Sequence, residues 1–488
     1  MRLFRRLFAT MLLAATVVGI VAIDRYQVTI GEGASSAIIS LGGFPQVSGG
    51  TRISSSWFCP GAAAGDGISS ASVVIVNPSD TEIIASVNYL SDALPESRTV
   101  KVEARSQVDV DILRGRTVGV VVPIVEIIGS VGTVEQELVY AAGDVTSQCV
   151  SQTSAQWFFA DGFTADGSTE RLVLTNPYPE SAVVNVSFTT TEGRRTPPVL
   201  QGLILAPRSV RSIFLTDAGA TNESRIAVEV STLSGQIIAS RIQHYLGAGR
   251  LGYSTTIGSP SPAKEWWFTS GRTGPGVTEE LVIFNPSSQT AQINISFFGE
   301  GITNGIPIDE KSPSAMPSST IDVEPGAVIA VKTDGIADLP KGDHAMVVTA
   351  IGGTPVVVEH VLSQQTGGKW FTAVTNGIPR GLLSEKWRVP SGLLNGARNA
   401  LQVLNTTGLD GTFTVAGVGP GGLVGFPTLI DRPLGAASLV SIDVPEGISL
   451  GEVVITATVP VAVQRRVSRG HGLVGFSIVG ALPVISRR

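Results

Sequence analysis

The stretch that decides the fold is Trp157–Phe188, which reads WFFADGFTADGSTERLVLTNPYPESAVVNVSF. A tryptophan-aromatic pair is followed by a glycine-containing loop and by the aliphatic run Leu172–Leu174, which stops at Asn176-Pro177. Proline cannot donate to a sheet ladder, and an asparagine side chain can close a turn, so this pair is expected to end a strand. Apolar residues then alternate with polar ones, at Val184, Val186 and Phe188. Such alternation is typical of a strand with one buried face.

The same pattern occurs four times. The openings are Trp57-Phe58-Cys59, Trp157-Phe158-Phe159, Trp267-Phe268-Thr269 and Trp387-Arg388-Val389, so successive tryptophans lie 100, 110 and 120 residues apart. The asparagines that end the first long strand are Asn77, Asn176, Asn285 and Asn405. Roughly seven short strands in every ~100 residues predict an immunoglobulin-like sandwich, since a β-propeller needs about half that period.

We therefore predict an all-β fold class: four tandem immunoglobulin-like β-sandwich repeats after an N-terminal transmembrane or signal helix. The predicted segments are a signal anchor or signal peptide at 1–25, a linker at 26–56, and repeats at 57–152, 153–262, 263–382 and 383–488. These four ranges are called repeat 1 to repeat 4 below.

The N-terminus predicts export. Arg2, Arg5 and Arg6 precede an uncharged run over 7–23 that ends at Asp24. A run of this length is short for a spanning helix but long for a signal-peptide core, so an uncleaved anchor and a cleaved signal both stay open. The positive flank is expected to remain in the cytoplasm, which places the rest of the chain outside.

Composition narrows the partners. The formal net charge is −6, with 34 basic and 40 acidic residues, and no basic stripe is present that would neutralise phosphates. We therefore expect no binding of nucleic acid. The chain has two cysteines, Cys59 and Cys149. In an exported chain such a pair favours a disulfide, and we predict one that joins the first and last strands of repeat 1.

The repeated motif resembles a family of uncharacterised actinobacterial secreted or signal-anchored β-repeat proteins, a domain of unknown function. The resemblance rests on the tryptophan-aromatic pair, glycine-rich loop, aliphatic strand, Asn-Pro and alternating strand, and covers most of 57–483. Repeat 4 departs from it, with Arg388 in place of phenylalanine and Thr406 in place of proline. The resemblance implies an envelope location and supplies no catalytic residues.

Four groups of residues resemble patterns found in catalytic, nucleotide-binding or metal-binding sites. Ser261 and Lys264 have the SxxK spacing of penicillin-binding enzymes, but that chemistry needs a helix start and a KTG strand. Gly417, Gly419 and Gly422 fit GxGxxG, which we interpret as a strand-to-strand loop. The acids Asp161, Asp166 and Glu170 are expected to be solvated, with calcium as the less favoured alternative. His244 and His360 are expected at corresponding strand positions of different repeats, where they cannot share a metal.

The aromatic pairs Trp266-Trp267 and Trp370-Phe371 lie near repeat junctions. Neighbouring strand residues face opposite ways, so one ring of each pair is expected to face outward, which makes Trp266 and Trp370 candidate binding aromatics. Packing between repeats is the interpretation that we favour for these pairs, with binding by an outward ring as the alternative. We expect no catalytic residue, metal or cofactor.

The sequence thus predicts a non-catalytic cell-envelope protein that acts as an extracytoplasmic binding or spacer scaffold. The alternative is a carbohydrate-binding or enzyme-accessory module of the cell wall. The expected partner is accordingly an envelope protein or a cell-wall glycan.

Overall fold

The structure is a computed structural model. It describes residues 43–48, 54–65, 67–93, 95–129, 132–141, 143–300, 302, 320–334, 336, 339–366, 368–390, 397–419, 421–444, 452–469 and 475–485. The predicted N-terminal helix lies outside these residues. Within the described residues, no helix is long and apolar enough to cross a membrane. The residues described all belong to the compact unit Gly43–Arg488.

Repeat 1 is a β-sandwich of two antiparallel sheets. The first is ordered β2 (Ser54–Phe58), β8 (Val120–Ile128), β5 (Ile83–Leu90) and β6 (Glu96–Val102), with β3 (Ala62–Ala63) paired to β8. The second is ordered β10 (Gly143–Gln148), β9 (Thr133–Tyr140), β4 (Ile68–Asn77) and β7 (Ser106–Asp111). Apolar residues from both sheets meet in one core, which includes Trp57, Val87 and Tyr89.

Repeat 2 follows the same plan. Its first sheet is ordered β11 (Gln156–Phe159), β17 (Ile226–Ser234), β13 (Ala182–Thr190) and β14 (Gly193–Arg195), with β15 (Leu203–Leu205) on β13. Its second sheet is ordered β16 (Ser209–Phe214), β12 (Thr169–Asn176), β18 (Ile238–Gly247) and β19 (Arg250–Ile257). Three short 3₁₀ turns lie in its loops: η1 (Ala165–Gly167), η2 (Pro198–Leu200) and η3 (Leu215–Ala218).

Repeat 3 again has two sheets. One is ordered β23 (Ile321–Val323), β22 (Ala291–Phe298), β25 (Gly342–Ala350), β20 (Glu265–Thr273) and β28 (Ile378–Pro379). The other is ordered β24 (Val328–Lys332), β21 (Val277–Phe284), β26 (Val357–Thr366) and β27 (Lys369–Asn376). The 3₁₀ turn η4 (Arg380–Leu382) leads to the next repeat.

In repeat 4 the two layers are continuous, because β35 (Glu452–Arg469) pairs with strands of both. One layer contains β37 (Leu482–Ile485), β29 (Ser384–Val389) and β31 (Gly411–Gly419), with β32 (Gly422–Gly425) and β33 (Arg432–Leu434) on β31. The other contains β30 (Ala397–Asn405), β34 (Leu439–Asp443) and β36 (Phe476–Gly480), and η5 (Pro427–Leu429) follows β32. The short strand β1 (Val47–Ser48) joins β37 in parallel.

The asparagine at the end of each long strand has the same role in all four repeats. Each is fully or almost fully buried. The Asn77 side chain donates to three carbonyl oxygens, of Thr81, Val102 and Glu103, and its Oδ1 accepts from the Ser79 amide. Asn176, Asn285 and Asn405 make the corresponding bonds. The predicted turn-closing role is therefore observed, and the same side chain also ties two loops together.

The tryptophan register needs one correction. The indole Nε1 of Trp57, Trp157 and Trp387 donates to the buried carbonyl of Gly132, Ile237 and Val461, respectively. In repeat 3 it is Trp266, not Trp267, that makes the corresponding bond, to the carbonyl of Val356. Trp266 also lies opposite Val348, as Trp157 lies opposite Val230. The opening of repeat 3 is therefore at Trp266, one residue earlier than the sequence pattern predicts.

The opening strand of each repeat lies beside that repeat's last residues. In repeat 1 the predicted disulfide between Cys59 and Cys149 is present, next to an antiparallel bridge between Phe58 and Val150. The same bridge joins Phe158 to Ser259, Trp267 to Ile378 and Arg388 to Leu482. With the corrected register, the positions matching Cys59 and Cys149 are Phe159 with Gly258 and Phe268 with Gly377. At both glycines a Cβ would overlap the phenylalanine ring, so a large ring and a missing side chain fill the space that the disulfide fills in repeat 1.

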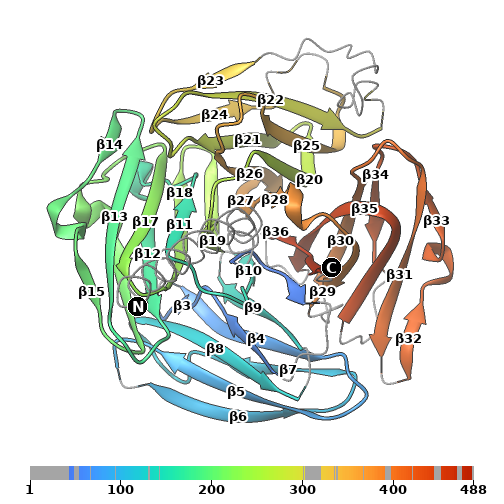
Figure 1. Ribbon diagram of the computed structural model, residues 1–488, viewed down its shortest axis with the longest axis horizontal. Helices are drawn as coiled ribbons and strands as arrows, with labels where there is room; N and C mark the ends of the chain where they lie inside the picture. Colours follow the sequence, from blue (N-terminus) through green and yellow to red (C-terminus); the bar gives the residue numbers. More distant parts are fainter. Residues whose placement is uncertain are drawn as a thin grey trace, which may run out of the picture. The chain divides into compact units, whose positions relative to one another are not determined.

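The four repeats close a ring within this unit (Figure 1). One edge strand of each sandwich lies at the centre, and these four strands touch in the cyclic order β10, β19, β27, β36 and back to β10. The region around these four strands is called the hub below. Residues 43–48, which were predicted to be part of a linker, are packed into it.

Candidate functional site: the hub and the joints between repeats

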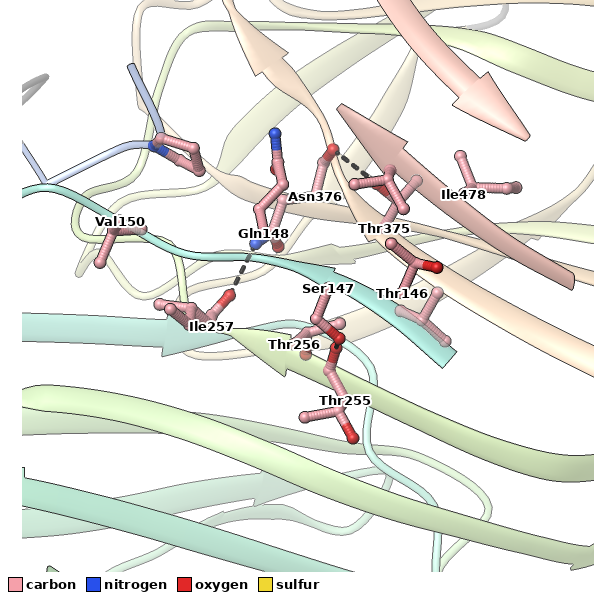
Figure 2. A pocket seen from close by; sticks show the side chains of 13 residues that line it. Thr146, Ser147, Gln148, Val150, Thr255, Thr256, Ile257, Thr375, Asn376 and Ile478 are labelled. Carbon is pink, nitrogen blue, oxygen red and sulfur yellow. Dashed lines mark hydrogen bonds between the residues drawn. The ribbon is translucent and has the colours of Figure 1, made fainter. Parts of the chain in front are cut away.

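The hub contains a small cavity of about 50 Å³ between its four strands. Figure 2 shows Thr146 and Ser147 of β10 near Thr255 and Thr256 of β19, with Thr375 of β27 on another side. Ser147 Oγ donates to the Thr255 carbonyl at 2.7 Å. The lining is uncharged and rich in hydroxyls and amides, and a space of this volume holds a few water molecules or one small polar group.

Polar side chains at corresponding positions join each repeat to the one before it. Glu135, Ser240, Glu359 and Gln464 all lie opposite the residue three before the turn asparagine. Ser240 Oγ donates to the Pro60 carbonyl, and the Thr269 amide donates to Gln464 Oε1 at 2.7 Å. Glu135 is bonded to Arg465, which joins repeat 1 to repeat 4 and completes the ring.

The joint between repeats 2 and 3 is the most charged. Arg241 forms a two-point contact with Glu359, at 3.0 Å and 3.2 Å between guanidinium nitrogens and carboxylate oxygens. Glu359 also accepts the backbone N–H groups of Ala160 and Asp161. Arg250 bonds Asp161 at 2.9 Å on one side and Glu280 at 2.8 Å on the other.

This joint corrects the expectation of solvated acids in repeat 2 for two of the three residues, whereas the third, Asp166, is exposed as predicted. Asp161 and Glu170 are both fully buried. Asp161 pairs with Arg250 on β19, the compensation that a buried carboxylate requires, whereas no side chain of the described residues bonds Glu170. No group of acids, histidines or cysteines that would hold a metal is found among the residues the structure describes.

Glu170 differs from its neighbours because no side chain of the described structure bonds its carboxylate oxygens, and the backbone of Phe163 is the hydrogen-bonding group beside them. Burial raises the pKa of Glu170 to about 8, and the charges of Asp161 and Glu359 act in the same direction while Arg241 opposes them. Glu170 is therefore protonated at neutral pH. A Cβ at Gly162 would overlap one of its oxygens, so the carboxyl group is tightly enclosed.

A second buried acid lies inside repeat 3. Glu279 is within 2.9 Å of His344 Nε2 through one oxygen and within 2.8 Å of His360 Nε2 through the other. The Thr333 hydroxyl and the Arg272 amide also donate to it, at 2.7 Å and 2.9 Å. Burial alone would raise the pKa of Glu279, but the charges of and hydrogen bonds from the two histidines outweigh burial and hold it far below the usual range. A cavity of about 290 Å³ adjoins Glu279.

The candidate aromatics are placed differently. Trp266 is fully buried and packs edge-on against Phe44, and Trp267 is also buried. The prediction that one ring of this pair faces outward is therefore wrong, because the first ring belongs to the core and the second packs against Phe298. Trp370, on β27, keeps part of its surface exposed.

The remaining motifs have structural surroundings. The carbonyl of Lys264 accepts from the Ala350 amide and Ala263 bridges to Val356, so the SxxK segment is extended backbone that leads into β20. Gly419 pairs with Gly422 across a hairpin, as expected for a loop. His244 and His360 do not correspond in position: His360 corresponds to Arg241, whereas His244 stacks on Tyr253 with centroids 4.0 Å apart.

Sequence reasoning missed the buried charged residues of the joints and of the interior of repeat 3, above all Arg241, Glu359 and Glu279. A signal was present. Counting back six residues from the turn asparagines gives Glu170, Glu279 and Asn399, which are polar residues at positions where the strand pattern predicts apolar ones. Buried polar groups at repeated positions indicate paired networks.

Fold and site together define an all-β protein of paired antiparallel sheets, joined by buried polar side chains. The chain belongs to the family of unknown function DUF5719, whose model matches residues 129–249 and 243–487 and so covers well over half of it. No curated protein matches the chain. Among solved structures it is similar to the "Crystal Structure of Thermotoga maritima 1070", at 17% identity and a TM-score of 0.20, over 25% of this chain and 97% of that one. That degree of similarity adds nothing to the fold.

Proposed function

We propose that this chain is a non-catalytic cell-envelope protein that acts as an extracytoplasmic binding scaffold. The arginine-flanked apolar run at the N-terminus supports export. The buried disulfide between Cys59 and Cys149 supports an oxidising compartment. The proposal includes a single membrane segment at 1–25, or a cleaved signal there, and four immunoglobulin-like repeats of the type found in actinobacterial surface proteins.

Ring closure is the observation that carries the binding role over the spacer role. A spacer separates its two ends, whereas here repeat 4 is bonded to repeat 1 through Arg465 and Glu135 and through contacts between β36 and β10. Buried ionic and polar joints hold neighbouring domains in a fixed arrangement. A fixed ring presents the loops of four sandwiches together, which suits recognition of a partner.

Crosslinking in intact envelopes tests this proposal. A C-terminally tagged chain is crosslinked on whole cells and purified, and we expect one envelope protein or a wall glycan to be enriched with it. The matched control is the same chain expressed in the cytoplasm without residues 1–25, which should recover neither. Resistance of the tag to protease added to spheroplasts, or free thiols at Cys59 and Cys149 in envelope extracts, would refute the location.

The alternative, a carbohydrate-binding or accessory module, depends on an accessible aromatic ring. Of the two candidates only Trp370 retains exposed surface. If glycan binding is the function, Trp370→Ala should lower retention on cell-wall polysaccharide at least tenfold, as expected for loss of a stacking ring. The control Tyr178→Ala alters an aromatic that is 40% exposed in another repeat. Unchanged retention in both variants would remove this alternative.

A further inference from the structure

The short segment Gly43–Ser48 touches all four repeats. Val47 and Ser48 pair in parallel with Val484 and Ile485 of repeat 4. The Gln46 carbonyl accepts a bond from Ser151 Oγ of repeat 1 at 3.4 Å. Gly43 lies against Pro260 and Ser154 of repeat 2, and Phe44 packs on Trp266 of repeat 3 with centroids 5.8 Å apart.

Four positions of this segment lie against parts of the hub that restrict which side chain fits. At Gly43 a Cβ would lie 2.6 Å from the Pro260 ring, so only glycine fits there. Phe44 and Val47 are both 3% exposed, and Val47 joins the apolar cluster that contains Leu482 and Cys149. Pro45 forms part of the wall of the hub cavity. The pattern read by the hub is thus Gly-Phe-Pro-x-Val.

Backbone pairing adds to this selection. The strand β37 is paired on one side with β29, and β1 covers its other side. Without that cover β37 would be an unpaired sheet edge, which is a ready template for another extended chain. Addition of a strand to such an edge, with pockets for alternate side chains, is a general mode of peptide recognition.

We propose that the hub is a groove for an extended peptide of the pattern Gly-Phe-Pro-x-Val, that residues 43–48 of this chain are its occupant, and that filling the groove closes the ring. The occupant is fixed by its register on β37, by the Phe44–Trp266 contact and by the Gly43 fit. The groove joins the last repeat to the other three, so emptying it loosens the contact between repeats 4 and 1. This inference is independent of where the protein resides.

A nicked full-length chain tests the groove without removing the segment before folding. A protease site is inserted between Gly49 and Gly50, and the purified folded protein is cleaved. We expect the N-terminal fragment to remain bound and to be released by an excess of the synthetic peptide LGGFPQVSGG, which is residues 41–50. The same peptide with Phe44→Ala should compete at least tenfold less well, and a scrambled peptide of equal composition should not compete.

Hydrogen exchange supplies the second measurement. Release of the fragment should speed amide exchange at least tenfold in β37, β36 and β10, with no change in β5 and β6 at the periphery of repeat 1. A nicked chain with Phe44→Ala should lose the fragment faster than the unsubstituted one. Immediate loss of the fragment on cleavage, equal competition by the scrambled peptide, or release with unchanged exchange would each overturn the proposal.

Discussion

Glu170 and Glu279 occupy the same position in repeats 2 and 3, six residues before the turn asparagine, yet their protonation states differ. Each lies on the first long strand of its repeat. The basic residue on the neighbouring strand is Arg241 in repeat 2, which lies opposite Leu172, and His360 in repeat 3, which lies opposite Leu281. Burial raises the pKa of Glu170 to about 8, whereas the two histidines hold the pKa of Glu279 far below the usual range. Both side chains are buried to the same extent.

The difference lies in where the cation is directed. Arg241 turns away from Glu170 and gives its hydrogen bonds to Glu359 of the next repeat and to Thr256. His360 and His344 keep their bonds within their own repeat, on Glu279. The arginine of repeat 2 therefore serves the joint and leaves Glu170 neutral, while repeat 3 has an ionised acid in its interior. The same strand position therefore holds a neutral acid in repeat 2 and an ionised acid in repeat 3, depending on which carboxylate the neighbouring basic residue bonds.

The largest expected effect is for Glu279→Gln. This substitution leaves two buried histidines and Thr333 without the carboxylate that they share, and removing one partner of such a buried network costs about 3–5 kcal/mol. We expect a loss of that size in unfolding free energy at pH 7, measured by urea titration. Glu192→Gln is the control, since Glu192 is paired on the surface with Arg195 and its side chain is 76% exposed.

The depressed pKa of Glu279 determines how the stability difference between wild type and Glu279→Gln changes with pH. Its folded-state pKa is depressed, so its contribution is present above the ordinary carboxyl pKa and is lost as the pH falls through the folded value. The gap between wild type and Glu279→Gln should therefore persist at pH 5 and narrow only in stronger acid. A variant as stable as wild type at pH 7 would show that the histidines do not use this carboxylate.

The same substitution at Glu170 should act in the opposite direction. Its folded-state pKa of about 8 lies above the ordinary carboxyl value of 4.5, so its contribution is fully present below pH 4.5 and is lost as the pH rises towards 8. Glutamine keeps the neutral state at every pH. Glu170→Gln should match wild type near pH 4.5 and exceed it by about 4 kcal/mol at pH 8 to 9.

Urea midpoints at three pH values measure this prediction. The control is Glu229→Gln, which removes a carboxylate of the same repeat that pairs with Arg194 near the surface. Destabilisation by Glu170→Gln at pH 8 would mean that the carboxylate is ionised in the folded protein, and the contrast with Glu279 would disappear.

Much of the fold followed from local pattern. The Asn-Pro turn and the alternating strand after it repeat at fixed spacing, so the strands, the turn role of Asn77 and its counterparts, and the Cys59–Cys149 bond were all predictable. The position of the opening tryptophan in repeat 3 was not, because Trp266 and Trp267 are adjacent and are distinguished by long-range contacts, the buried hydrogen bond to Val356 and the pairing with Val348.

The joints could not be predicted because they depend on how repeats contact one another. Asp161 and Glu359 lie 198 residues apart, and nothing in the sequence near either one shows that they meet. Residues 43–48 were predicted to be part of a linker for the same reason. A stretch of six residues with one glycine and one proline has no hydrophobic periodicity, and its contacts are all long-range. Burial of Asp161 likewise depends on its pair with Arg250, which is distant in sequence.

The smallest effect is expected at Asn399, which occupies the same position in repeat 4. Asn399 is buried, its Oδ1 lies 3.4 Å from Arg465 Nη1, and its amide nitrogen has no hydrogen-bond partner in the described structure. Asn399→Asp therefore removes no donor bond and places a carboxylate beside a buried arginine that already holds Glu135. The burial cost and the attraction to Arg465 largely offset each other, so we expect a change within about 1 kcal/mol at pH 7.

Ala71→Asp, at the corresponding position of repeat 1, is the comparison, because the residue opposite Val73 there is the uncharged Gln136 and the new carboxylate would lack a matching arginine. A loss for Asn399→Asp as large as that for Ala71→Asp would show that Arg465 is committed to the joint in the way that Arg241 is, and that repeat 4 resembles repeat 2 and not repeat 3.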